Sequence, residues 1–119
     1  MKSAIALGIA AAVLAVSPLS SASARSAYDG AWSLDFATQR GTCSTYHFDV
    51  NISNGIVSHP NLVKFRGRVS SGGRAYVSVA VMDKSASGSG RLTKSSGRGR
   101  WTGRSGHDRC SGSWTAQRG

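Results

Sequence analysis

A glycine-arginine pair in which Ser or Thr follows two positions after the arginine occurs three times in this sequence. The phrase is Gly-Arg-apolar-Ser/Thr, and it begins at Gly67, Gly90 and Gly99. The planar guanidinium group binds phosphate and carboxylate in a forked geometry, and a nearby hydroxyl offers a hydrogen bond to a sugar or phosphate oxygen. The spacing therefore indicates a surface that binds anions.

Further cations surround these three arginines in two stretches of the chain. Residues 64–68 alternate cations with other residues, and residues 88–109 hold six cations against the single acid Asp108. Because side chains alternate across a strand, the even-numbered cations of the first stretch share one face. The candidate polyanion-binding residues are Lys64, Arg66, Arg68, Arg91, Arg98, Arg100 and Arg104.

Catalytic and metal-binding patterns are not found. The sequence has no G-x-S-x-G, no G-x-x-x-x-G-K-[ST] and no H-E-x-x-H. Asp35 and Asp49 could face each other across two strands, as many pairs in a small sheet do. His47, His59 and His107 lack ligand spacing, and His47 alternates out of the apolar set of its strand, which predicts exposure. We expect no enzymatic activity, no cofactor and no metal site.

The elements that position the cations are expected to be short β-strands. Apolar and polar residues alternate in residues 32–36, 46–52, 63–69 and 77–81, and Asn54-Gly55 is a strong hairpin signal because both positions tolerate a positive φ. No convincing helix pattern follows residue 24. The sequence predicts an all-β antiparallel meander of about seven or eight strands that closes into a barrel or a sandwich.

A broader phrase, Gly-x-apolar-Ser/Thr, describes how these strands divide their two faces. The glycine and the apolar residue share one face, where the missing side chain leaves room for an indole or a branched side chain of a neighbouring strand. The middle residue and the hydroxyl face the other way, so the arginines are expected to face water. The phrase begins at Gly30, Gly55, Gly67, Gly90, Gly99 and Gly112.

The start of the chain is predicted to be an export signal. Residues 1–24 combine Lys2, the apolar run Ala4–Val16 and the small residues Ala22-Ser23-Ala24. This run is too short to span a bilayer as a helix. Residues 25–119 then form a single β-rich domain, located in the periplasm or outside the cell.

Cys43 and Cys110 are the only two cysteines. An oxidising compartment would join them, and we expect a structural bond that ties the second strand to the last. Because no C-x-x-C is present, reactive or metal-binding thiols have less support.

The charge of residues 25–119 favours anionic partners. These residues carry 14 basic and 5 acidic side chains and no glutamate. Outside the cytoplasm the common polyanions are lipopolysaccharide phosphates, acidic polysaccharides and phospholipid headgroups, so a membrane surface is a further candidate. Nucleic acid is not an expected partner in that compartment. The alternative is a solvated surface whose cations protect strand edges from aggregation.

Several motifs together resemble one family. "YDGAWS", "RGTC", the Asn-Gly hairpin, "GSGRL", "SSGRGRWTG" and "CSGSWTAQR" are similar to small exported proteins of rhizobial-type alphaproteobacteria, often labelled "large exoprotein involved in heme utilization or adhesion". The resemblance extends from Tyr28 to Arg118. It implies an exported adhesion-type protein and supplies no catalytic residues.

A second resemblance supports a different function. "AWSLDFATQRGTC" is similar to the opening of small periplasmic β-barrel protease inhibitors, in which one disulfide braces an eight-stranded barrel. That disulfide is more local in the inhibitors than a Cys43–Cys110 bond would be. Two functions follow: a non-catalytic binding module for anionic envelope or extracellular polymers, and an inhibitor or partner of an enzyme.

We predict that the exported protein begins at or close to Arg25, because signal peptidase cuts after small residues such as those at 22–24. The intact mass of the protein recovered from the producing cell tests this. A full-length species that retains Lys2 would contradict the export hypothesis.

Overall fold

Eight strands make up the fold of this chain. The structure is a computed structural model that describes residues 27–119, so the predicted signal peptide lies outside the described residues. The strands are β1 (Gly30–Arg40), β2 (Tyr46–Ser53), β3 (Ile56–Ser58), β4 (Phe65–Val69), β5 (Arg74–Val81), β6 (Lys84–Leu92), β7 (Ser96–Ser105) and β8 (Asp108–Arg118).

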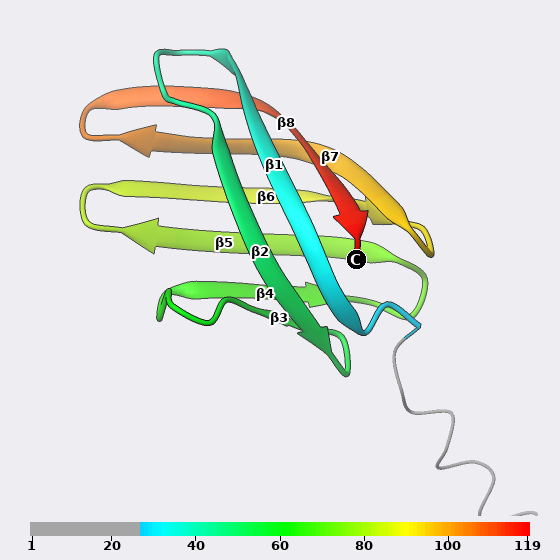
Figure 1. Cartoon of the computed structure of the whole chain (residues 1–119). Helices are drawn as coiled ribbons and strands as arrows, with labels where there is room; N and C mark the ends of the chain where they lie inside the picture. Colours follow the sequence, from blue (N-terminus) through cyan, green and yellow to red (C-terminus); the bar gives the residue numbers. More distant parts are fainter. Residues whose placement is uncertain (1–26) are drawn as a thin grey trace, which may run out of the picture.

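The strands form a closed antiparallel barrel (Figure 1). Each strand pairs with the next along the chain, and β1 also pairs with β8, in register from Trp32–Arg118 to Arg40–Ser111. The predicted all-β meander is therefore confirmed, and of the two predicted closures the barrel is the one formed. Within residues 27–119 no helix has the length and hydrophobicity required to span a bilayer.

The connections gather at the two ends of the barrel. We call one the disulfide end, formed by residues 41–45, 59–64, 82–83 and 106–107. The opposite end, here the terminus end, holds the turns at 54–55, 70–73 and 93–95 together with Tyr28 and Arg118. Arg118 helps to close the terminus end, because its guanidinium lies 5.5 Å from the ring centre of Trp32 and donates to the carbonyl of Ala27 at 3.0 Å.

Alternation of side chains fills the barrel interior. Burial alternates along β4 and over most of β1 and β5, as the period of two predicts, and the interior contains no buried charged residue among those described. Interiors of eight-stranded barrels are just wide enough for side chains to fill them. The buried apolar side chains are Trp32, Leu34, Phe36, Val50, Ile52, Val57, Phe65, Val69, Ala75, Val77, Val79, Leu92, Trp101, Cys110, Trp114 and Ala116.

The glycines of β6 and β7 make room for Trp114, as the Gly-x-apolar-Ser/Thr phrase predicts. Gly90 and Gly99 are register partners. A Cβ added to Gly99 would lie 2.5 Å from Trp114 Nε1, and one added to Gly90 would lie 2.8 Å from Trp114 Cζ2. The indole therefore lies directly on the backbone of the two strands, at a distance that only glycine permits.

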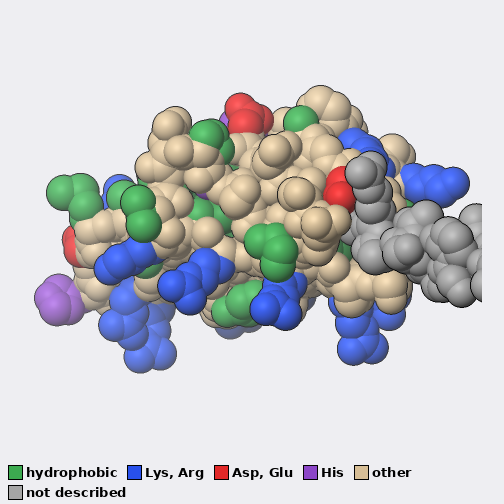
Figure 2. All heavy atoms as spheres, turned by 90° about the horizontal axis from the view of Figure 1, so that it is seen from below, with side chains coloured by type: hydrophobic (Ala, Val, Ile, Leu, Met, Phe, Trp, Pro, Cys, Tyr) green, Lys and Arg blue, Asp and Glu red, His purple; other side chains and the backbone are tan. Residues whose placement is uncertain are grey.

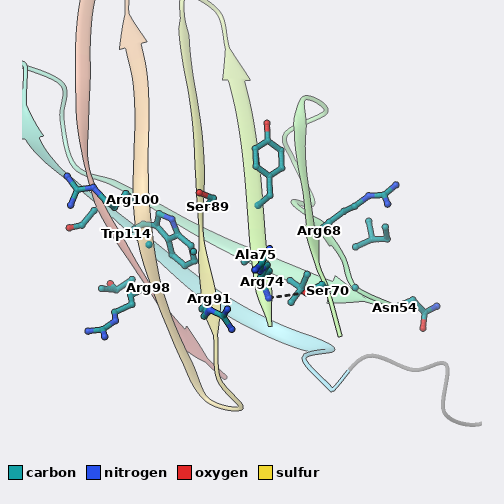
Figure 3. Close-up of a pocket in the computed structure, with 18 residues that line it drawn as sticks. Asn54, Arg68, Ser70, Arg74, Ala75, Ser89, Arg91, Arg98, Arg100 and Trp114 are labelled. Carbon is teal, nitrogen blue, oxygen red and sulfur yellow. Dashed lines mark hydrogen bonds between the residues drawn. The ribbon is translucent and has the colours of Figure 1, made fainter. Parts of the chain in front are cut away.

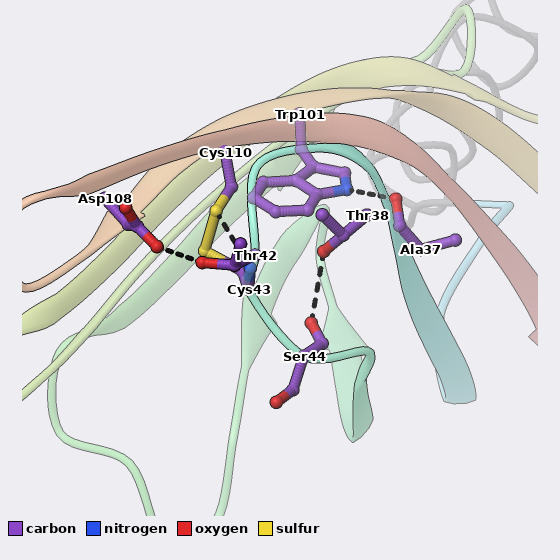
Figure 4. The surroundings of a disulfide bond; sticks show 8 residues. All are labelled: Ala37, Thr38, Thr42, Cys43, Ser44, Trp101, Asp108 and Cys110. Atoms are coloured by element: carbon purple, nitrogen blue, oxygen red, sulfur yellow. Dashed lines mark hydrogen bonds between the residues drawn. A yellow bond between two sulfur atoms is a disulfide. The ribbon is translucent and has the colours of Figure 1, made fainter.

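The Cys43–Cys110 disulfide is confirmed, but its place differs from the prediction (Figure 4). Cys43 lies in the loop between β1 and β2, so the bond ties this loop, and not the second strand, to β8. The sequence separation of 67 residues corresponds to roughly 4 kcal/mol on the chain-entropy account. The loop is also held by a hydrogen bond from Thr42 Oγ1 to Asp108.

A bulge in β1 accompanies this loop. The register of β1 with β8 shifts between Thr38 and Arg40, and the indole of Trp101 donates to the carbonyl of Ala37 at 3.0 Å (Figure 4). Bulges redirect strands at barrel rims.

Val63 differs from its prediction. The alternation over 63–69 predicts an inward-facing Val63, but β4 begins at Phe65, and Val63 is 94% exposed in the loop before it. A period of two cannot locate the first residue of a strand.

We predict that Gly99→Ala destabilises the protein by about 1–3 kcal/mol, because the new methyl overlaps the indole of Trp114. Gly72→Ala is the matched control, since no atom lies within 4 Å of a Cβ there. Urea unfolding of both variants measures the difference. Equal stability of the two would disprove the packing argument.

Candidate functional site

Six of the seven predicted cations lie at outward-facing positions of the strands, and Lys64 lies in the loop 59–64 of the disulfide end. Every one of their side chains is exposed, and Figure 2 shows lysine and arginine side chains gathered along one side of the molecule. The structure brings four of them into one groove, namely Arg68, Arg91, Arg98 and Arg100. The other three, Lys64, Arg66 and Arg104, lie outside this groove.

The groove crosses the outside of β3 to β8 towards the terminus end. Its volume is about 1130 Å³. Figure 3 shows Arg98 and Arg100 at one side of the groove and Arg68 at the other. A fifth arginine, Arg74, also lines it.

Strand register places these arginines in rows. Arg74 of β5 lies opposite Arg91 of β6, and Arg91 lies opposite Arg98 of β7. Adjacent strands are about 4.8 Å apart, so this arginine row spans roughly 10 Å of backbone. The next row contains Arg68, Tyr76, Ser89, Arg100 and Ser113 in successive register.

No acidic side chain compensates the arginine row. Among the described residues no aspartate lines the groove, and none of its five arginines takes part in an ion pair. Like charges that lie directly opposite each other on neighbouring strands destabilise a sheet. The groove is therefore a concentrated positive field that costs folding stability.

The acids lie elsewhere. Asp35 and Asp49 are on the outer face of β1 and β2. Asp83 and Asp108 are in or next to turns of the disulfide end, and Asp29 accepts hydrogen bonds from the backbone amides of the 54–55 turn. The acidic side chains therefore lie on other parts of the barrel than the arginines of the groove.

The floor of the groove is one layer of backbone. Gly90 and Gly99 line the groove, and the buried Trp114 packs on the same two glycines from inside. Trp114 Nε1 has no hydrogen-bond partner among the described residues. The indole therefore packs directly against the backbone of the two strands that carry Arg91, Arg98 and Arg100.

The predicted hydroxyl partners are only partly in the groove. Ser70 lines it, and its Oγ accepts a hydrogen bond from the amide of Arg74 at 3.1 Å. Thr93 lies in the turn after β6, where its Oγ1 donates to the carbonyl of Ser96, and Thr102 lies outside the groove. The neighbouring strands supply Ser89, Ser113 and Thr115 instead.

Sequence reasoning missed Arg74. Arg74 is the first residue of β5, directly after the Gly72-Gly73 turn. It faces outward, as Tyr76 does, whereas Val77 faces inward. The alternation of the valines in β5 indicates which of its residues face outward, so the outward position of Arg74 could have been predicted. That Arg74 lies opposite Arg91 depends on the register of β5 with β6, which cannot be predicted from the local sequence pattern.

A second polar cluster forms on the face of β1 and β2. His47 is exposed, as predicted, and lies between two carboxylates: its Nδ1 is 2.7 Å from Asp35 Oδ1 and its Nε2 is 3.0 Å from Asp49 Oδ1. Hydrogen bonds to Asp35 and then Asp49 raise the pKa of His47 above 6.5. The hydrogen bonds from His47 and Ser33 lower the pKa of Asp49.

This cluster is not arranged as a nucleophile and its base. Ser33 Oγ donates to Asp49 at 3.1 Å, and both ring nitrogens of His47 are occupied by carboxylates. In a nucleophile–base pair the base lies within hydrogen-bond reach of the nucleophile, and among the described residues the ring nitrogens of His47 contact carboxylates and no hydroxyl. The arrangement instead stabilises the charged imidazolium.

Within residues 27–119 no three His, Cys or Asp side chains are placed together so that they could hold a metal ion. The fold and the groove together define a small disulfide-braced β-barrel with a basic outer groove. No protein-family model, curated protein or solved structure matches the chain.

We predict that the pKa of His47, measured by NMR titration, is higher in the parent than in Asp35→Asn, because that variant removes the largest cause of the upward shift. Since the folded pKa lies above the unfolded value, the stabilisation is complete below about pH 6.5 and is lost as the pH rises through the folded pKa. Equal pKa values in the two proteins would refute this account.

Proposed function

We propose that this protein is an exported, non-catalytic binding module whose basic groove binds anionic polysaccharide or lipopolysaccharide of the cell envelope or the extracellular matrix. The observation that carries the proposal is the arginine row, Arg74–Arg91–Arg98, which forms no ion pair with an acidic residue in the region 27–119. A soluble surface needs cations, but it does not need three of them in adjacent register.

An anionic ligand offsets the repulsion within the row. Each exposed contact between an arginine and a carboxylate or phosphate contributes less than about 1 kcal/mol. A polymer that crosses the groove contacts several arginines at once, and the contacts add through effective concentration. The hydroxyls of Ser89, Ser113 and Thr115 provide hydrogen bonds for sugar hydroxyls along the same path.

The cellular compartment of the proposal is supported by two features. The predicted signal peptide at residues 1–24 favours export, and the Cys43–Cys110 disulfide is typical of proteins in oxidising compartments. The polyanions available there are polysaccharide, lipopolysaccharide and lipid headgroups. The predicted adhesion-type role is consistent with binding to such polymers.

The second candidate function is inhibition of an enzyme or another protein contact through loops. Val63 is 94% exposed and Met82 is 98% exposed, both on the disulfide end. Exposed apolar side chains mark a protein contact where they form one contiguous patch, and this candidate function requires that Val63 and Met82 belong to such a patch. Salt separates the two functions, since polyanion binding weakens steeply with ionic strength and a tight apolar interface does not.

We predict that changing Arg74, Arg91 and Arg98 together to Ser weakens binding to polygalacturonate roughly tenfold at low salt, because three contacts are lost. Changing Lys64, Arg66 and Arg104 to Ser removes the same charge outside the groove and is expected to weaken binding far less. Biolayer interferometry measures the binding of both variants. Polyphosphate serves as the phosphate-bearing ligand, and dextran is the neutral control.

The thermal midpoint of the groove variant is expected to stay equal or rise, because like-charge repulsion is removed. Equal loss in both triple variants would locate binding in the general charge and not in the groove. Binding that persists in the groove variant would refute the proposal.

A further inference from the structure

We infer that the disulfide end of the barrel contains a second, internal binding site for a small apolar molecule that carries one anionic group. A cavity of about 220 Å³ lies inside this end. It shares no lining residue with the basic groove, so it is independent of the proposed function.

The cavity exists because the two ends of the barrel are filled differently. At the terminus end Trp32 is fully buried below Arg118. At the disulfide end the aromatic rings of Phe36 and Phe48, 5.7 Å apart, line the cavity, while the apolar residue that β6 contributes to the lining is the small Ala86. A small residue among large rings leaves space.

The lining of the cavity defines the body of the ligand. Four aromatic side chains, Phe36, Tyr46, Phe48 and Trp101, surround it together with Val79 and Val81. An apolar cavity of about 150 Å³ stays dry and accepts benzene, so this cavity accepts a molecule somewhat larger than one aromatic ring. Mouths of β-barrels are common ligand sites.

The mouth of the cavity defines the charge of the ligand. Lys84 lies in register with Val81 at the start of β6 and lines the cavity, as does Arg104 of β7. Within the part of the chain that the structure describes, no acidic residue lines the cavity. A carboxylate at the mouth therefore meets the Lys84 ammonium while the apolar body remains inside, which points to a small arylalkanoic or alkanoic acid.

The probes that test this site are 4-phenylbutyrate, 4-phenylbutanol and 4-phenylbutylammonium, which share one body and differ in charge. Calorimetry on the oxidised protein is expected to show saturable one-to-one binding, with the anion about fivefold tighter than the alcohol and the ammonium weakest. NMR shifts are expected at the methyl groups of Val79 and Val81. No saturable binding of the anion would overturn the inference.

Two pairs of variants locate the ligand. Val81→Trp fills the mouth of the cavity and is expected to weaken the binding of 4-phenylbutyrate roughly tenfold or more. Met82→Trp adds the same side chain at the next residue, which does not line the cavity, and is expected to leave this binding unchanged. Lys84→Gln is expected to remove the preference for the anion over the alcohol. Lys94→Gln, at the terminus end, is its control.

The far-UV circular dichroism of each variant reports that the barrel is intact. Equal binding in Val81→Trp and Met82→Trp would overturn the inference. Loss of 4-phenylbutyrate binding in the Arg74, Arg91 and Arg98 triple variant would place the anion in the groove and would also overturn it. That triple variant therefore distinguishes failure of this inference from failure of the polyanion proposal.

Discussion

The pairing of β1 with both β2 and β8 is the contact on which the rest of the structure depends. It converts a meander into a closed barrel, and closure removes the free edges that a sheet of this size would expose. Closure also encloses the inward-facing side chains of every strand in one core. The disulfide acts at the same place, because it ties the loop after β1 to β8 and so restrains the two strands whose pairing closes the barrel.

The interior and the outer face are linked through glycine. Trp114 requires that Gly90 and Gly99 carry no side chain, and the same two strands carry Arg91, Arg98 and Arg100 on their other face. Packing inside therefore positions the cations outside, because strand period and register connect the two faces. The β1–β2 face differs, since Asp35 and Asp49 hold His47 there and no arginine row forms.

Much of the fold could be predicted from local pattern, and less of the candidate site. The alternation of Trp32, Leu34 and Phe36, the cysteine pair and the outward parity of Arg68 are properties of neighbouring residues or of composition, and each is found as expected. Val63 and the strand position of Cys43 were predicted wrongly. Both lie in loops between strands, because hydrogen bonds to other strands decide where a strand begins or ends and the local pattern does not.

What the sequence by itself determined is the alternation along each strand: which residues face the core, which face water, and that the water-facing set is basic. What only the tertiary structure decided is which residues of different strands lie opposite each other. Arg74 joins Arg91 and Arg98, and His47 is enclosed by two aspartates, through cross-strand register. Register depends on turn geometry, on closure and on the packing of the tryptophans across strands, and these are interactions between residues distant in the chain.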